Sequence, residues 1–118
     1  MITRTVVDGH TVCVSVEFSR KPSEGDVRYA FENFAGVPQE RHLPSAPPRP
    51  VIYMTEANRP QPRKDAERER GMAAFVGRLR ACPVLDYKFV ALGHNTIRGA
   101  AGAAVLNAEL MHSEGMLD

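Results

Sequence analysis

The fold of this chain is decided by the stretch Asp8-Gly9-His10-Thr11-Val12-Cys13-Val14-Ser15-Val16-Glu17-Phe18. From Val12 onward, large apolar residues stand at every second position, which predicts a half-buried β-strand. The strand leaves directly from a turn that holds His10. An imidazole between a turn and a strand can exchange protons near neutral pH, so His10 is the first candidate functional residue.

A helix is predicted shortly after this strand. Ser23 is a suitable N-cap for it, and Gly36 and Pro38 are suitable residues to end it. Between these positions, apolar side chains recur at helical spacing, at Val27, Ala30, Phe31 and Phe34. A strand, a turn and a helix are therefore expected to open the chain.

The middle of the chain is rich in proline and then in charge. Most of the nine prolines lie in residues 38–62, around the short apolar run Val51-Ile52-Tyr53-Met54. Because proline lacks an N–H and restricts the residue before it, this segment is predicted to be extended, with one edge strand. Charges of both signs alternate in residues 59–70, which favours a solvated loop over a nucleic-acid-binding patch.

Two further strands and a long helix are predicted in the last third. Residues 74–80 and 87–92 have strand patterns, and the short connection through Pro83 suggests an antiparallel pair. Asn95 or Thr96 can cap a final helix over residues 95–112. One face of this helix has mainly small residues, which would let another backbone approach closely, and it consists of Ile97, Ala101, Ala104, Ala108 and Met111.

These patterns predict one α+β domain over residues 1–118, with a mostly antiparallel or mixed sheet of about four strands and two main helices. The apolar share of 43% is enough for a modest core. A formal net charge of +1 gives no strong field for nucleic acid or an anionic membrane. Residues 99–106, the longest weakly polar stretch, are far short of the roughly 20 residues that span a bilayer.

Cysteine and histidine usage points to an intracellular protein without a metal. The first residues do not resemble a targeting segment, so Cys13 and Cys82 are expected to be reduced thiols in a cytoplasmic protein. His42 and His112 have no partners at metal-ligand spacing, and no metal site is predicted. None of these patterns identifies a function.

Four motifs, in order, resemble aspartate-β-semialdehyde dehydrogenase, particularly its archaeal and fungal branch. They are Asp8-Gly9-His10-Thr11, Asn58-Arg59-Pro60-Gln61-Pro62-Arg63, Val76-Gly77-Arg78-Leu79-Arg80 and His94-Asn95-Thr96-Ile97-Arg98-Gly99-Ala100-Ala101-Gly102. The resemblance covers nearly the whole chain, and the last motif is the most specific.

The resemblance implies that residues 1–118 are the C-terminal catalytic and dimerisation segment of a two-domain, NADP-dependent enzyme of amino-acid biosynthesis. The nucleotide-binding domain would lie outside this chain, which has no Gly-x-Gly-x-x-Gly motif after a strand. The final helix, residues 95–112, would pack on that domain. The chain alone is therefore expected neither to bind NADP nor to turn over substrate, and its unpartnered helix face is expected to favour a dimer or larger homo-oligomer.

The resemblance also implies roles for three residues in the reductive dephosphorylation of aspartyl phosphate to aspartate semialdehyde. His10 matches the acid/base histidine that serves a cysteine nucleophile, and neither Cys13 nor Cys82 matches that cysteine. Arg4 is the candidate for gripping the substrate carboxylate, although it stands six positions before His10 where the family has seven. Asn95 matches a position near the nicotinamide, and as a plain helix N-cap it would have a purely structural role.

Two other interpretations stay open from the sequence. The chain could be a stand-alone oligomerisation or binding module derived from this enzyme. It could also be a fragment of the related N-acetyl-γ-glutamyl-phosphate reductase. The motif from Asn95 to Gly102 argues against this second interpretation.

Overall fold

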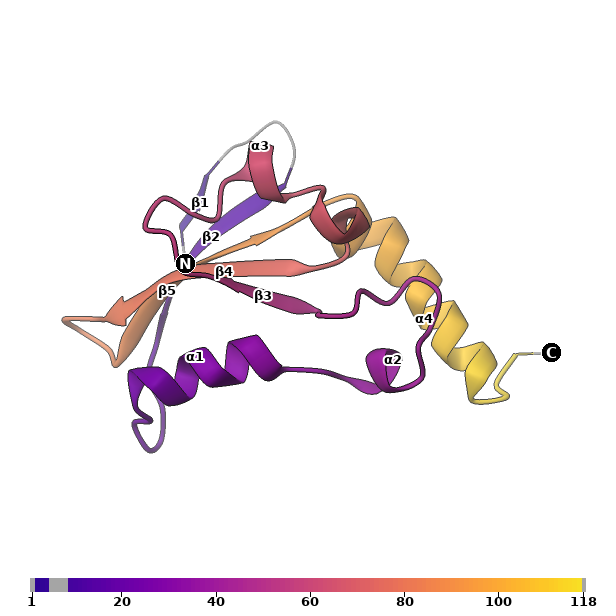
Figure 1. Cartoon of the computed structure of the whole chain (residues 1–118), viewed down its shortest axis with the longest axis horizontal. Coiled ribbons are helices and arrows are strands. Elements are labelled where there is room, and N and C mark those ends of the chain that lie inside the picture. The colour runs from indigo at the N-terminus through magenta and orange to yellow at the C-terminus, as the bar shows by residue number, and fades with distance from the viewer. Residues whose placement is uncertain (1, 5–8, 118) are drawn as a thin grey trace.

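The computed structural model describes residues 2–4 and 9–117, with the side chains of residues 2–4 left undescribed. Its centre is a five-stranded sheet in the order β1-β2-β5-β4-β3 (Figure 1). The strands are β1 (Ile2–Arg4), β2 (His10–Val16), β3 (Val51–Met54), β4 (Ala74–Ala81) and β5 (Tyr87–Gly93). The helices are α1 (Glu24–Asn33), α2 (Val37–Glu40), α3 (Pro62–Asp65) and α4 (Gly102–Ser113), with a 3-10 turn at Arg68–Gly71 and a π-helical turn at Ile97–Ala101.

The predicted α+β class and mixed sheet are confirmed. β2, β5 and β4 pair antiparallel, as the short connection through Pro83 predicts. β3 is an edge strand that pairs parallel with β4. The sheet has one strand more than predicted, because the three-residue β1 pairs antiparallel with β2.

Helix α1 covers one side of the sheet, and α3 lies on the other (Figure 1). Ser23 caps α1 as predicted, because its hydroxyl accepts the Asp26 N–H at 3.1 Å and the Asp26 carboxylate accepts the Ser23 N–H. Val27 packs in a cluster with Leu79 of β4 and Tyr87 of β5. This contact fixes the end of the sheet that is remote from His10.

The other side of the sheet carries the second part of the core. Phe75 of β4 is completely buried, and its cluster includes Leu92 of β5 and Ile52 of β3. Burying one such side chain contributes roughly 1.5–3 kcal/mol to stability. The guanidinium of Arg68 lies 5.2 Å from the Phe75 ring centroid, so the segment around α3 covers this cluster.

The prediction of a solvated loop over residues 59–70 is wrong. This segment forms α3 and the 3-10 turn, and it buries both Asp65 and Ala66. Alternating charges suggested solvent exposure, but Asp65 is neutralised inside the protein by two arginines from the same segment.

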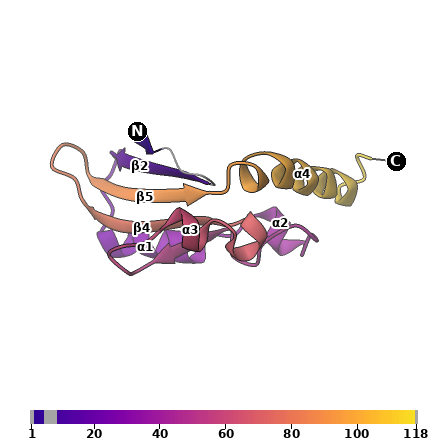
Figure 2. The same ribbon diagram turned by 90° about the horizontal axis from the view of Figure 1, so that it is seen from above.

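Helix α4 extends away from the sheet, as the two views agree (Figures 1 and 2). It is held at its base by Leu106, which packs with Leu43 and Met72. Of the predicted face, Ile97 takes part in this contact, whereas Ala101, Ala104, Ala108 and Met111 are exposed. The rest of the inner face is formed by larger residues, Leu106 and Leu110.

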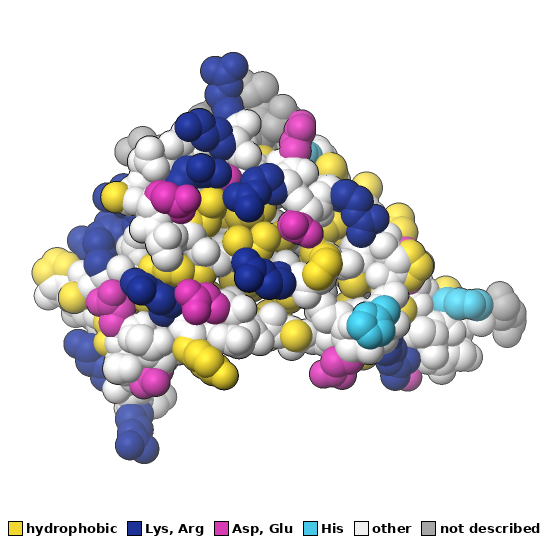
Figure 3. All heavy atoms as spheres, in the orientation of Figure 1, with side chains coloured by type: hydrophobic (Ala, Val, Ile, Leu, Met, Phe, Trp, Pro, Cys, Tyr) yellow, Lys and Arg dark blue, Asp and Glu magenta, His cyan; other side chains and the backbone are white. Residues whose placement is uncertain are grey.

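The described surface has mixed charge. Figure 3 shows Lys and Arg side chains interspersed with Asp and Glu over one face of the molecule, in keeping with the small net charge. Among the described residues, no helix is both long and apolar enough to cross a membrane.

Candidate functional site

His10 lies at one corner of the sheet, where it begins β2 and pairs with Gly93 at the end of β5. The residue before it, Gly9, has a φ of +89°, and a Cβ there would stand 3.2 Å from Ala66 Cβ. Glycine is therefore required by both conformation and space. The His10 side chain is exposed, and no hydrogen bond joins its imidazole to the described part of the chain.

Asn95 ties this corner to the segment that leads into α4. Its Oδ1 accepts the Gly9 N–H at 2.9 Å, across 86 residues of sequence. The carboxamide is half-buried, and its Nδ2 has no partner among the described residues, so it remains available as a donor. Of the two predicted caps for the final helix, Asn95 and Thr96, Thr96 occupies the N-cap position but makes no side-chain capping bond, and the oxygen of Asn95 is used by Gly9.

His94 performs the capping instead. Its imidazole is 7% exposed, and Nδ1 lies 3.3 Å from the Thr96 N–H and 3.2 Å from the Ile97 N–H. Because Nδ1 accepts both bonds, the ring proton must reside on Nε2. His94 therefore stabilises the start of the helical segment, and Asn95 stabilises the backbone next to His10.

Replacing Asn95 by alanine is expected to loosen the His10 corner without unfolding the protein. Loss of the acceptor leaves the Gly9 N–H unpaired, at a cost of about 1 kcal/mol. Hydrogen exchange followed by NMR should show faster exchange of the Gly9 amide, whereas Asn95→Asp, which keeps an acceptor, should protect it. Unchanged Gly9 exchange in the alanine variant would show that the bond does not hold this turn.

Arg4 lies in the strand next to β2, and its side chain is outside what the structure describes. Its backbone is in β1, opposite Thr11 of β2. Antiparallel partners have Cα atoms about 4.5–5.5 Å apart. β1 therefore runs next to the strand that begins with His10, and residues 5–8 lie outside the described residues.

Both cysteines are free thiols. Cys13 is exposed on β2, and Cys82 is half-buried at the turn between β4 and β5. Hydrogen bonds from the backbone N–H groups of Leu85 and Val84 lower the pKa of the Cys82 thiol. Among the residues that the structure describes, no group of three or more His, Cys, Asp and Glu side chains could hold a metal ion.

A buried ion pair behind this corner was missed by sequence reasoning. Asp65 is fully buried, and Arg59 binds it with Nε and Nη2, the first at 2.8 Å from Oδ2. The Gln61 N–H donates to the same Oδ2 at 2.7 Å. Burial raises the pKa of the Asp65 carboxyl, but the bonds from Arg59, Gln61 and Arg68 together lower it below its usual value. No signal in the sequence distinguished Asp65 from the exposed charged residues around it.

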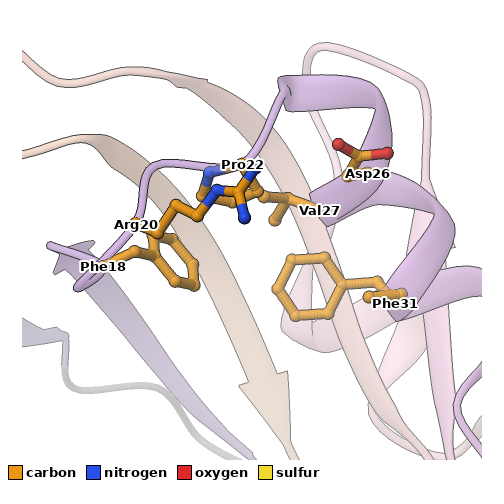
Figure 4. Close-up of a pocket in the computed structure, with 7 residues that line it drawn as sticks. Phe18, Arg20, Pro22, Asp26, Val27 and Phe31 are labelled. Carbon is orange, nitrogen blue, oxygen red and sulfur yellow. The ribbon is translucent and has the colours of Figure 1, made fainter.

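Cavities lie on both sides of the sheet in the described structure. One, of about 420 Å³, lies between α1 and the connection from β2, and there Phe18 and Phe31 face each other near Arg20 (Figure 4). The other, of about 330 Å³, lies on the α3 side of the sheet and is lined by Thr11 and Cys13 of β2. Neither cavity is lined by His10 or Asn95.

The architecture is that of a semialdehyde dehydrogenase. The chain matches the structure of aspartate semialdehyde dehydrogenase II from Vibrio cholerae with a TM-score of 0.69 at 23% identity, over 92% of this chain and 28% of that one. This likeness shows the fold. Residues 5–98 match the family described as semialdehyde dehydrogenase, dimerisation domain, and the chain belongs to that family.

Relatives at higher identity agree with this assignment. Aspartate-semialdehyde dehydrogenase from Methanothermobacter thermautotrophicus is 50% identical over 91% of this chain and 31% of its own length. The structure of the Candida albicans enzyme with NADP gives a TM-score of 0.86 at 38% identity, over 95% of this chain and 32% of that one. The malonyl CoA reductase (NADP) of Metallosphaera sedula is 40% identical over 95% of this chain. This chain thus spans about a third of these relatives' length.

Proposed function

We propose that residues 1–118 are the C-terminal catalytic and dimerisation segment of an NADP-dependent, cytoplasmic aspartate-semialdehyde dehydrogenase. The observation that carries this proposal is the 2.9 Å bond from the Gly9 N–H to Asn95 Oδ1, which joins two motifs of the family at one corner of the sheet. It brings the candidate acid/base histidine and the candidate cofactor contact together.

His10 is the group that moves the proton. It is exposed and its imidazole is unpaired within the described residues, so either ring nitrogen can meet a thiol supplied from outside this chain. The adjoining Gly9–Asn95 bond orients the turn, and Arg4 on the neighbouring strand would bind the substrate carboxylate through its guanidinium. Neither Cys13 nor Cys82 is the sheet partner of His10, which pairs with Gly93.

Asn95 has the chemistry to contact a nicotinamide. Its oxygen is occupied by Gly9, which leaves Nδ2 to donate to a carboxamide oxygen. In the reductive direction, the reduced cofactor NADPH would supply the hydride when bound. The exposed residues Ala100 and Ala101, just beyond, offer little steric hindrance to a nucleotide-binding domain. The final helix, residues 95–112, would pack on that domain through its exposed alanine face.

A second candidate substrate is a CoA thioester, because the malonyl CoA reductase relative is 40% identical to this chain. Both reactions convert an activated carboxyl group to an aldehyde. The residues of this chain would perform the same proton transfer in each, and the activating group would be bound elsewhere.

The proposal is tested with a chimera in which this chain replaces the matching third of the Methanothermobacter thermautotrophicus relative. NADPH formation from aspartate semialdehyde is expected to require phosphate, with turnover well above that of the isolated chain. A second chimera places this chain in the Metallosphaera sedula relative and is offered malonyl-CoA and NADPH. A first chimera that folds and binds NADP but is inactive would contradict the proposal, and activity in the second chimera alone would favour the second candidate.

A further inference from the structure

We propose that the cavity of about 330 Å³ on the α3 side of the sheet binds a small molecule carrying a carboxylate or phosphate group, and that Arg78 holds this group. The cavity lies where two of the family motifs meet, the loop over residues 58–62 and the middle of β4. Neither motif takes part in the function proposed above, and this site is independent of it.

Arg78 occupies an unusual backbone position. Its φ is +58°, in the left-handed region that side chains other than glycine and asparagine rarely adopt. The pairing of β4 with β5 shifts register between Gly77 and Arg80, so Arg78 sits on a bulge. Bulges commonly redirect a side chain next to a site. An arginine therefore occupies a position where the backbone conformation favours glycine, and this arginine lines the cavity.

The loop over residues 58–62, which lines the cavity, is held in place at two points. A Cβ at Gly77 would collide with the Arg59 carbonyl oxygen, so the backbone of the loop packs directly against β4. The same Arg59 is anchored by buried Asp65, which also accepts the Gln61 N–H at 2.7 Å. A loop fixed at two neighbouring residues keeps its shape when a ligand binds, which lowers the entropy cost of binding.

The lining favours an anion. The Arg78 guanidinium has no ion pair with any described residue, and the carboxamides of Asn58 and Gln61 lie along the same cavity. None of the described lining residues is acidic. Thr11 Oγ1, beside the cavity, is buried without a hydrogen-bond partner in the described structure. A buried polar atom of this kind calls for a partner.

The volume indicates a ligand larger than a bare ion. It falls at the lower end of the range of about 300–1,000 Å³ that is usual for small-molecule sites. Pro60 and Val90 provide apolar wall on the side away from the charge. A short organic acid or a phosphate monoester matches this combination of one cationic end and one apolar side.

Cys13 provides a reporter, because its exposed thiol lines the cavity. In the full 118-residue chain with Cys82→Ser, alkylation of Cys13 by iodoacetamide is measured in succinate, in phosphate and in sodium chloride of equal ionic strength. Succinate, phosphate or both should slow alkylation at least threefold. The protection should disappear in Arg78→Gly and persist in Arg20→Gln, which removes the same charge at the other cavity.

Arg78→Gly separates binding from folding, because glycine adopts the left-handed backbone conformation without strain. The melting temperature of this variant should therefore equal or exceed that of the wild type. Protection by succinate alone would assign a carboxylate ligand, and protection by phosphate alone would assign a phosphate ligand. The proposal is overturned if neither succinate nor phosphate slows alkylation of Cys13. It is equally overturned if Arg78→Gly is protected as well as the chain that retains Arg78. It is also overturned if alkylation slows with rising protein concentration in chloride alone, since a second copy would then cover the cavity.

Discussion

Asp65→Asn should destabilise the protein by about 3–5 kcal/mol, the usual cost of removing one partner from a buried ion pair. The variant leaves Arg59 only 20% exposed and facing an amide that cannot neutralise it. It also weakens the bond from the Gln61 N–H, which now meets a neutral acceptor. Because typical domains unfold with only 5–15 kcal/mol, this single substitution should strongly lower the denaturation midpoint.

Chemical denaturation checks this expectation, with Glu67→Gln as the matched control. Glu67 is an exposed acid of the same segment, and its loss should change stability by less than about 0.5 kcal/mol. If Asp65→Asn unfolds at the same denaturant concentration as this control, the ion pair does not stabilise the fold.

The pKa shift of Asp65 gives this prediction a pH dependence. The folded-state pKa is lowered from 3.8, so the ionised carboxylate stabilises the folded state above that pH. The stabilisation is lost as pH falls below 3.8 towards the folded-state value. The difference in unfolding free energy between wild type and Asp65→Asn should therefore be constant near neutral pH and shrink in acid. A constant difference down to pH 2 would contradict the assignment.

The second large effect concerns His10 in the active chimera. His10→Ala should reduce kcat by roughly 10²–10⁴-fold, the range typical for loss of a general acid or base. NADP binding should change little, because no contact of His10 with the cofactor is part of the proposed role. His112→Ala is the matched control, since it removes an exposed histidine near the end of α4.

The pH profile distinguishes proton transfer from a structural role. The wild-type rate should titrate with an ionisation that is absent from the residual rate of His10→Ala. A fall of less than threefold in kcat, or an unchanged pH profile, would remove His10 from the catalytic role while leaving the family assignment intact.

Local pattern was sufficient for much of the fold. The alternating residues of β2, the cap at Ser23 and the short connection between β4 and β5 are determined by neighbours in sequence, and all three were predicted. The parallel pairing of β3 with β4 was not, because proline-rich flanks say only that a strand lies at an edge. The face of α4 was misjudged because its alanines match helical spacing as well as Leu106 and Leu110 do.

The candidate site was predicted through resemblance and not through local pattern. His10 and Asn95 were named on motifs, and their roles stay predictions. That they lie at one corner depends on a bond across 86 residues, which no local pattern contains. The burial of Asp65 was missed for the same reason: its charge resembles that of its exposed neighbours, and only the surrounding fold distinguishes it.

The bond between Gly9 and Asn95 has a mechanical consequence. Asn95 begins the segment that carries α4, and Gly9 is the residue before His10, so neither can shift far without stretching or breaking the bond. A force that pulls α4 towards another domain is therefore transmitted to the base of the imidazole. By thermodynamic reciprocity, whatever steadies His10 also steadies the angle at which the helix leaves the sheet.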